Sequence, residues 1–478
     1  MVRHAARASI AVILFLIAGV ARGATAPPPA AVPPEDNRQL ARTVLAELIA
    51  IRSVHDVGTR ETAAVVARHL AAAGFGGDDL AVLPEERYPN QVDVVARLRG
   101  RGHGRPVLWN CHMDVVDARP EDWSVPPFQL TEKEGWLYGR GTTDMKDQCA
   151  TMVAAFARLK AEGYVPERDL VAAFTADEEV GLEQDGMDDL LRNHRPIVDA
   201  ALVINPDDHV GRLIDGRRAL LEIQTSEKTY ATFTLETTSS GGHSSEPRPD
   251  NAIYQLARGL TRLEHYEFPY RTNATTRLFF ERMAAFQTGQ RRADMRAVAK
   301  GTVPEPRAAA RLARDTSLNS ILHTTCVATM LAAGVQENAL PQRAQATVQC
   351  RLMPDESVEQ TRATLARVVA DPGIDVRLAS PVVSGPESPP TPEFLGTIER
   401  VAHSMWPGVA VVPTMAAGAS DSLYTRAAGM PSYIVNGTWE DFEDDRRHGR
   451  DERREVGVFD ENLEFTYRLM KTLGSAPP

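Results

Sequence analysis

The chain has 478 residues, of which 43% are hydrophobic and 24% are charged, and its formal net charge is −11. This composition is that of a folded globular protein and excludes a disordered one. The acidic balance argues against nonspecific nucleic-acid binding, because neutralising phosphates needs a basic surface. The length exceeds that of one ordinary hydrophobic core, so we expect at least two domains.

The N-terminus has the pattern of a signal peptide over residues 1–23. Arg3 and Arg7 precede the apolar run Ile10–Val20, and small residues flank a cleavage site at Ala21-Arg22-Gly23. The pattern predicts export to the periplasm or the exterior, with an uncleaved anchor as the alternative. Residues 24–35 are rich in Ala and Pro and predict a flexible tether. We expect no membrane span in the mature chain.

Strands and helices then alternate, which predicts a mostly parallel α/β sheet. Short apolar runs predict strands over Val92–Leu98, Val107–Cys111, Leu170–Thr175 and Ala201–Ile204. Apolar residues at helical spacing predict helices over Arg38–Ile51, Arg60–Gly74 and Asp144–Gly163. The first part of the chain is therefore expected to form a sheet buried by helices on both faces.

The pattern changes near Leu220, where a smaller α+β domain is expected as an insertion. Strands are predicted over Leu220–Thr225, Tyr230–Thr237, Thr324–Leu331 and Gln345–Leu352. Helices are predicted over Asn251–Glu264, much of Arg271–Leu318, and Val358–Val369. The first pattern resumes near Pro390, with a helix over Glu393–Ser404, a strand over Tyr433–Val435 and a helix over Asn462–Leu473.

The four cysteines form no closely spaced pair, so the sequence predicts no disulfide framework. Cys111 and Cys149 lie beside potential metal ligands, and we interpret them as small buried side chains in preference to thiolate ligands. Cys326 and Cys350 lie on strand-like segments that could be neighbours. A disulfide between them is compatible with an oxidising compartment, and the sequence leaves this question open.

Metal-binding residue types follow the predicted strands. His112 and Asp114 come at the end of one strand, and residues two apart in extended backbone point to the same side. Asp144 opens a helix, where it could be a helix cap or a ligand that bridges two cations. Glu178 and Glu179 follow another strand within Asp177-Glu178-Glu179. A solvated acidic turn is the simpler interpretation, but ligands bind at strand ends in such sheets.

Two further segments could complete a site. Asn205-Pro206-Asp207-Asp208 follows a predicted strand, and Asp207 is the preferred ligand within it. Near the C-terminus, His448 offers a second imidazole after a Gly-containing loop. Any one of these residues alone is more often structural, but five such segments at successive strand ends indicate a metal hydrolase.

The ordered motifs resemble the co-catalytic zinc peptidase superfamily. They are HMDVV at His112, GRGTTDMKD at Asp144, TADEEVG at Glu178, NPDD at Asp207 and HGRDER at His448. Members of this superfamily include carboxypeptidase G, aminoacylase, succinyl-diaminopimelate desuccinylase and carnosinase-like dipeptidases. The resemblance runs from about Asp36 to the end of the chain.

The resemblance implies two Zn²⁺ ions per subunit, with Co²⁺ or Mn²⁺ as substitutes. One ion would be bound by His112, Asp144 and Asp207, and the other by Asp144, Glu179 and His448. Asp144 would bridge the ions, Asp114 would orient His112, and Glu178 would be the general base. This chain departs from the common family pattern at Asn205–Asp207, and Asp147 stands where Gly is common.

The resemblance also implies an inserted lid or dimerisation domain over 222–386, between catalytic parts 36–221 and 387–478. In the family, a lid histidine reaches the active site, often from the partner subunit of a homodimer, and His243 matches it. Residues that match segments lining the substrate pocket of relatives are Asn338, Arg351, Gly418 and Ser420.

The sequence therefore predicts an exported hydrolase that uses two metal ions to cleave amide bonds in short peptides or at a terminal residue. An N-acyl-amino-acid deacylase is the alternative, because both substrates place a carboxylate near an amide. A non-catalytic binding protein with the same fold is a remote third interpretation. In the predicted mechanism Glu178 activates water, and His243 donates a hydrogen bond to the developing oxyanion.

Overall fold

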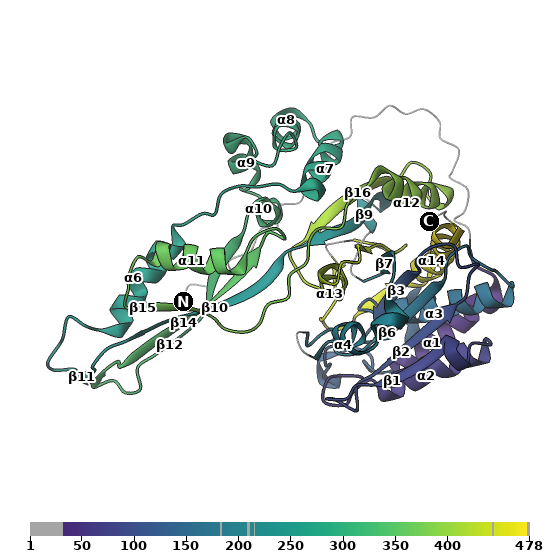
Figure 1. Cartoon of the computed structure of the whole chain (residues 1–478), viewed down its shortest axis with the longest axis horizontal. Helices are drawn as coiled ribbons and strands as arrows, with labels where there is room; N and C mark the ends of the chain where they lie inside the picture. Colours follow the sequence, from purple (N-terminus) through teal and green to yellow (C-terminus); the bar gives the residue numbers. More distant parts are fainter. Residues whose placement is uncertain (1–31, 182–183, 208–210, 215, 442–443, 476–478) are drawn as a thin grey trace.

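The computed structural model describes residues 32–475 except 182–183, 208–210, 215 and 442–443. The predicted signal peptide and most of the predicted tether lie outside the described residues. Figure 1 shows two lobes, one built on a large sheet and the other on a smaller sheet with its own helices. No helix in the described part of the chain is long and apolar enough to cross a membrane.

Among the described residues, the large sheet has ten strands and a parallel centre. Nine strands follow the order β1 (Leu80–Pro84), β2 (Val92–Leu98), β6 (Leu170–Thr175), β3 (Val107–His112), β7 (Leu202–Asn205), β17 (Ser432–Ile434), β9 (Arg217–Glu227), β8 (Gly211–Ile214) and β18 (Trp439–Glu440). The tenth strand, β16 (Ala410–Ala416), pairs with β9 in parallel. β3 is parallel to both β6 and β7, and β7 is parallel to β17. The carboxyl ends of these central strands therefore meet at one edge.

Helices cover both faces of this sheet because alternate side chains of the central strands are apolar on both sides. Trp109 and Phe174 belong to the largest core cluster, while Leu108 and Val171 belong to a cluster on the opposite face. The first face is covered by α1 (Glu35–Ile49), α2 (Arg60–Ala72), α3 (Lys146–Ala161), α12 (Pro392–Met405) and α14 (Val456–Ser475). The other face is covered by α4 (Gly186–Asn193), α5 (Arg195–Val198) and α13 (Ser422–Ala427). A small sheet of β4 (Thr131–Lys133), β5 (Trp136–Tyr138) and β19 (Arg453–Glu455) lies beside the domain.

The smaller lobe, called the lid below, is a four-stranded antiparallel sheet with two helices. The strand order is β12 (Thr325–Ala333), β14 (Arg343–Leu352), β10 (Thr229–Thr238) and β15 (Ile374–Leu378). One face packs on α6 (Ala252–Glu264) and α11 (Val358–Val369), and a short pair of β11 (Gly242–His243) and β13 (Ala339–Leu340) extends from it. Side chains alternate between buried and more exposed along β10, as expected for a sheet with one covered face.

The polar, Arg-rich stretch forms a separate bundle of short helices. These are α7 (Ala274–Met283), α8 (Gly289–Val298), α9 (Pro306–Leu312) and α10 (Thr316–Leu322). Their apolar faces form a third core cluster, which includes Leu220 of β9 and Val412 of β16. The bundle therefore packs on the outer strands of the large sheet, beside the connection to the lid (Figure 1).

The predicted fold is confirmed, with corrections to individual elements. Neither β1 nor β16 was predicted from the sequence, and α14 begins at Val456 where Asn462 was expected. The strand predicted over Leu220–Thr225 as part of the inserted domain belongs instead to the large sheet, as part of β9. The open question about the cysteines is answered by a disulfide between Cys326 and Cys350, which are opposite residues on β12 and β14. Cys111 and Cys149 are free and buried, as interpreted from the sequence.

Candidate active site

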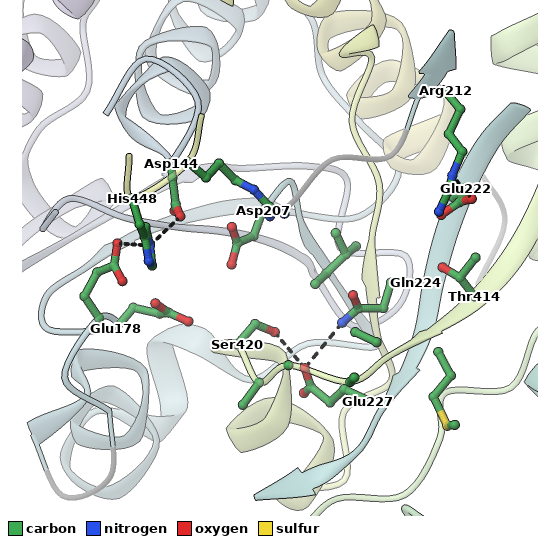
Figure 2. A pocket seen from close by; sticks show the side chains of 18 residues that line it. Asp144, Glu178, Asp207, Arg212, Glu222, Gln224, Glu227, Thr414, Ser420 and His448 are labelled. Atoms are coloured by element: carbon green, nitrogen blue, oxygen red, sulfur yellow. Dashed lines mark hydrogen bonds and ion pairs between the residues drawn. The ribbon is translucent and has the colours of Figure 1, made fainter. Parts of the chain in front are cut away.

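Six predicted side chains gather where the central strands end. His112 is the last residue of β3, Glu178 and Glu179 follow β6, and Asp207 follows β7. Asp144 precedes α3, and His448 comes from the loop before β19. Figure 2 shows Asp144, Glu178, Asp207 and His448 turned toward one space. This is the edge of an open α/β sheet at which ligands bind.

Nitrogen and oxygen donors form two groups that share Asp144. In one group His112, Asp144 and Asp207 offer ligand atoms within 4.8 Å of one another, and in the other Asp144, Glu179 and His448 do so. His112 Nε2 lies 3.2 Å from one oxygen of Asp144, and His448 Nε2 lies 3.0 Å from its other oxygen. His448 Nε2 is also 3.1 Å from Glu179 Oε1. Such groups of imidazole and carboxylate suit zinc, cobalt or manganese.

Asp114 contacts both His112 and the turn that carries Glu178 and Glu179. His112 Nδ1 lies 3.1 Å from the backbone carbonyl of Asp114 and 3.5 Å from its carboxylate oxygen Oδ1. The two carboxylate oxygens of Asp114 accept hydrogen bonds from the backbone amides of Glu178 and Glu179, at 3.2 and 3.1 Å. The same residue therefore contacts the His112 ring and holds the turn that carries both glutamates.

The electrostatics of the site favour positive charge. Burial alone would lower the pKa of His112, but Asp114 and Asp144 raise it well above its usual value. Hydrogen bonds to Asp144 and Glu179 raise the pKa of His448 to about 10. Burial raises the pKa of Glu178 well above its usual range, although His112 opposes the shift. The carboxylates stabilise positive charge on both histidines, and a bound metal cation would be stabilised by the same carboxylates.

Residues outside the predicted set shape the loop before Asp144. Glu452 is fully buried, and its Oε1 accepts hydrogen bonds from the backbone amides of Gly141, Thr143 and Asp144 at 2.7 to 3.2 Å. Its other oxygen pairs with Arg140. Glu452 lies within the HGRDER motif, from which only His448 was predicted to have a role. No local pattern indicates that the Glu452 carboxylate would reach the turn before Asp144.

Two chambers open at the site. The first, of about 580 Å³, contains Asp144, Glu178, Glu179, Asp207 and His448, and it extends along β9 and β16. Its further lining residues, none of which was predicted from the sequence, include Arg212, Glu222, Gln224, Glu227 and Thr414 (Figure 2). Arg447 also lines it. The only signal for them was the alternation of the polar residues Glu222 and Gln224 in an apolar strand. Gly418 and Ser420, predicted to bind substrate, do line this chamber.

The second chamber, of about 320 Å³, shares Glu178, Ala419 and Ser420 with the first. Its walls are largely hydrocarbon and come from both lobes, with Val180, Tyr230, Val383, Leu423 and Tyr424, and they include the buried carboxylate of Asp185. Its lining, as far as the described residues go, contains no Lys, Arg or His. The site therefore offers a polar space and an apolar space on either side of Glu178.

The predicted lid residues lie away from the donor groups in this chain. His243 is on the exposed strand β11, which Figure 1 places at the end of the lid remote from β3 and β6. Asn338 is beside it, and its carbonyl accepts a hydrogen bond from the amide of Ser244. Arg351 is nearer, with its guanidinium 4.6 Å from the ring centre of Tyr230, which lines the second chamber. Neither His243, Asn338 nor Arg351 is among the described residues that line the first chamber.

This site and fold define a metal-dependent hydrolase of amide bonds, and the non-catalytic interpretation is set aside. The chain belongs to peptidase family M20/M25/M40, whose profile matches residues 108–472. The resemblance found in the sequence is thereby confirmed, and enzymes of this family depend on metal.

Sequence relatives span most of the chain. The human N-fatty-acyl-amino acid synthase/hydrolase PM20D1 is 28% identical over 77% of this chain and 74% of its own length. A probable carboxypeptidase S-like 2 of Dictyostelium discoideum is 26% identical over 77% of this chain and 71% of its own length. Among solved structures, the metallo-carboxypeptidase Sso-CP2 of Sulfolobus solfataricus superimposes with a TM-score of 0.66. It is 16% identical and covers 91% of this chain and 99% of its own, so it supports the fold alone.

Proposed function

We propose that this protein is a dinuclear-metal hydrolase that releases an amino acid from an amide. The observation that carries the proposal is the pair of donor groups that share Asp144. One cation would be bound by His112, Asp144 and Asp207, and the other by Asp144, Glu179 and His448. The mixture of nitrogen and oxygen donors favours Zn²⁺, with Co²⁺ or Mn²⁺ as substitutes.

We assign the role of proton carrier to Glu178. When bound, the two cations would polarise the scissile carbonyl and acidify water. Glu178 belongs to neither donor group, and its Oε2 lies 3.9 Å from His112 Nε2. A buried carboxylate with a raised pKa can take a proton from water and return it to the leaving amine. Asp114 holds Glu178 in place through its backbone amide.

The second chamber suggests the substrate class. Its hydrocarbon walls suit an apolar acyl group, whereas the first chamber is polar and suits the amino-acid end. Two arginines of that chamber, Arg212 and Arg447, pair with Glu222 and Asp445. We therefore propose N-acyl-amino acids with an apolar acyl group as substrates, and the likeness to PM20D1 supports this choice. Short peptides with an apolar residue before the scissile bond are the second candidate, because the same chamber would accept a side chain.

A substrate panel on the zinc- and cobalt-loaded protein tests this proposal. We expect N-octanoyl-amino acids to be cleaved with a higher kcat/KM than dipeptides and than N-acetyl-amino acids. Val180→Asp should lower kcat/KM for the octanoyl substrate about tenfold or more, because a charge then faces the acyl chain. Val165→Asp is the matched control, since Val165 is 51% exposed and outside the chamber while Val180 is 44% exposed. Equal losses in both variants would contradict the acyl site.

We also propose that the lid forms a homodimer. β12 is an edge strand of the lid sheet, and it exposes Val327, Met330 and Leu331 by 56, 69 and 66%. A long apolar edge strand is a surface for pairing with another chain. Since His243 lies remote from its own donor groups, a partner's site is the place where it would act.

Export is part of the same proposal. The Cys326–Cys350 disulfide supports it, because disulfides persist in oxidising compartments and are rare in the cytosol. N-terminal sequencing of the protein recovered from outside the cytoplasm should begin near residue 24. Recovery of the intact chain from the cytoplasm with reduced Cys326 would contradict export.

A further inference from the structure

Glu227 is a buried carboxylate that the mechanism above does not use. It is the last residue of β9, immediately before the connection to β10 of the lid, and it is only 2% exposed. It lines the first chamber but belongs to neither donor group. A buried charge is costly unless it is paired and hydrogen-bonded, so its partners indicate what it does.

One oxygen of Glu227 is paired with an equally buried cation. Its Oε1 lies 2.9 Å from Arg426 Nη1, and both side chains are at most 2% exposed. The rest of the Arg426 guanidinium donates to the carbonyl of Ser432, at 2.9 and 3.1 Å, and to Ser388 Oγ at 3.1 Å. Arg426 therefore fixes Glu227 to β17 and to the segment that returns from the lid.

The other oxygen of Glu227 accepts a hydrogen bond from the hydroxyl of Ser420. Ser420 Oγ donates to Glu227 Oε2 at 3.1 Å, and Gln224 donates to the same oxygen at 3.3 Å (Figure 2). Ser420 Oγ also accepts a hydrogen bond from the backbone amide of Ser422, at 3.2 Å. A hydroxyl has one proton and two lone pairs. The hydroxyl proton of Ser420 is directed to Glu227, and one of its lone pairs accepts the amide of Ser422. Ser420 therefore retains one lone pair without a donor among the described residues.

We propose that Ser420 accepts a hydrogen bond from the N–H of the scissile amide, and that Glu227 is the positioning residue that makes it an acceptor. This inference rests on the proposed function. Ser420 and Glu178 both line both chambers, so an amide that spans the two chambers passes between them. The carboxylate of Glu227 cannot donate, so the hydroxyl proton stays directed away from the substrate.

The chemical consequence is a preference for secondary amides. An N-methylated or prolyl amide has no N–H and would leave the lone pair of Ser420 unsatisfied. The loss of one neutral hydrogen bond corresponds to about a tenfold change in rate. The enzyme should therefore discriminate against substrates that differ from good ones only by this methyl group.

Paired substrates test the role of Ser420. The pairs are N-octanoyl-phenylalanine with its N-methyl counterpart, and the dipeptide Leu-Phe with its N-methyl counterpart, all measured on the zinc-loaded protein. For whichever pair is cleaved, Ser420→Ala should lower kcat/KM for the N–H substrate about tenfold. The substitution should leave kcat/KM for the N-methyl substrate nearly unchanged. The ratio of kcat/KM between the N–H and N-methyl substrates should therefore fall about tenfold.

Glu227→Gln tests the positioning. The side-chain oxygen of the introduced glutamine would face Arg426, and its NH₂ group would donate to Ser420 Oγ. The hydroxyl proton of Ser420 would then turn toward the substrate. The N–H preference should again fall about tenfold, with metal content unchanged. Ser388→Ala is the control, because Ser388 contacts Arg426 but lies outside both chambers. It should keep the preference even if stability drops.

The possible failures are distinguishable. If zinc-loaded protein cleaves no amide in either pair, the proposed function is wrong. If it cleaves the N–H and N-methyl substrates equally, or if Ser420→Ala keeps the full preference, the acceptor role of Ser420 is wrong while amide hydrolysis stands. If Ser420→Ala loses the preference and Glu227→Gln keeps it, the part assigned to Glu227 is wrong.

Discussion

Two neighbouring glutamates should respond to the same substitution in different ways. Glu178→Gln removes the proposed base but no member of either donor group, so both metal ions should remain bound. We expect kcat to fall by a factor of roughly 10²–10⁴, the usual contribution of a general base. Elemental analysis together with steady-state kinetics makes the measurement.

Glu179→Gln is the matched control for this experiment. Glu179 belongs to the donor group of Asp144 and His448, so its substitution should lower the metal content as well as turnover. A Glu178→Gln protein that keeps both metals and near-normal kcat would show that the base is another residue. A Glu178→Gln protein that loses metal would make Glu178 a ligand.

At the residue scale, the sequence predicted the side chains whose position follows from topology. His112 ends a parallel strand, Glu179 and Asp207 each follow one, and these strand ends meet at one edge of the sheet. Glu227 and Glu452 could not be predicted in the same way. Their contacts, with Arg426 and with the turn before Asp144, depend on how loops far apart in sequence pack.

Among the elements, the turn before α3 depends on one buried carboxylate. Glu452 accepts three backbone hydrogen bonds from this turn, including the one from Asp144 itself. Glu452→Gln removes the negative charge and converts one acceptor oxygen into an NH₂ group, so Asp144 should lose its fixed position. We expect zinc affinity at both ions to fall about 10–100-fold, as is usual when a residue that supports a metal ligand is replaced. Zinc titration against a competing chelator measures this. An unchanged affinity would mean that the turn is held by its other contacts.

The connection between β9 and β10 contains a buried lysine with a pH-dependent effect on stability. Lys228 Nζ donates to the carbonyls of Ser320 and His323, both at 2.8 Å, at the end of α10. Burial lowers the pKa of Lys228 from 10.5 to about 7, with Glu356 opposing and Arg351 reinforcing the shift. Between pH 7 and pH 10.5, Lys228 is protonated to a greater extent in the unfolded chain than in the folded chain. The free energy of unfolding therefore rises with pH over this range.

The expected result is a difference between two variants. The free energy of unfolding of the wild type should rise relative to that of Lys228→Met from pH 7 to pH 9, by at most about 1.4 kcal/mol per pH unit. Lys300→Met, at an exposed lysine, should show no such trend. Urea denaturation at pH 7, 8 and 9 supplies the measurement. A constant difference across this range would show that Lys228 is charged in the folded state.

Element prediction worked best where hydrophobic periodicity was strong. The helix α3 and the strand β6 were predicted because their apolar residues repeat over a whole element. β16 contains Pro413 and is followed by the small residues Ala417, Gly418, Ala419 and Ser420, so its sequence does not indicate a strand. The Cys326–Cys350 bond depends on the register of β12 against β14, which no local pattern specifies.

At the scale of the whole molecule, the lid raises a question of assembly. The sequence indicated an inserted lid and a lid histidine, but a single chain leaves His243 exposed at the end of the lid. The exposed apolar strand β12 is the surface through which we propose that two lids pair. The proposed site is then complete only when a second copy supplies its histidine.

Subunit mixing tests this arrangement. His243→Ala and Glu178→Gln should each be nearly inactive as homodimers, because every site lacks one proposed group. In a mixed dimer, the site with an intact Glu178 receives His243 from the partner, so one site of the two is complete. Activity should therefore return when the two inactive proteins are unfolded and refolded together. Refolding each protein alone should restore nothing.

Leu331→Asp separates assembly from folding. Leu331 is 66% exposed on β12, so the substitution should not damage the core but should place a charge in the proposed interface. The variant should elute as a monomer in size-exclusion chromatography, retain its metal and lose most of its turnover. Its introduction into both mixing partners should also abolish the recovery of activity. If the monomeric variant kept full kcat, His243 would have no part in the reaction, and the site would be complete within one chain.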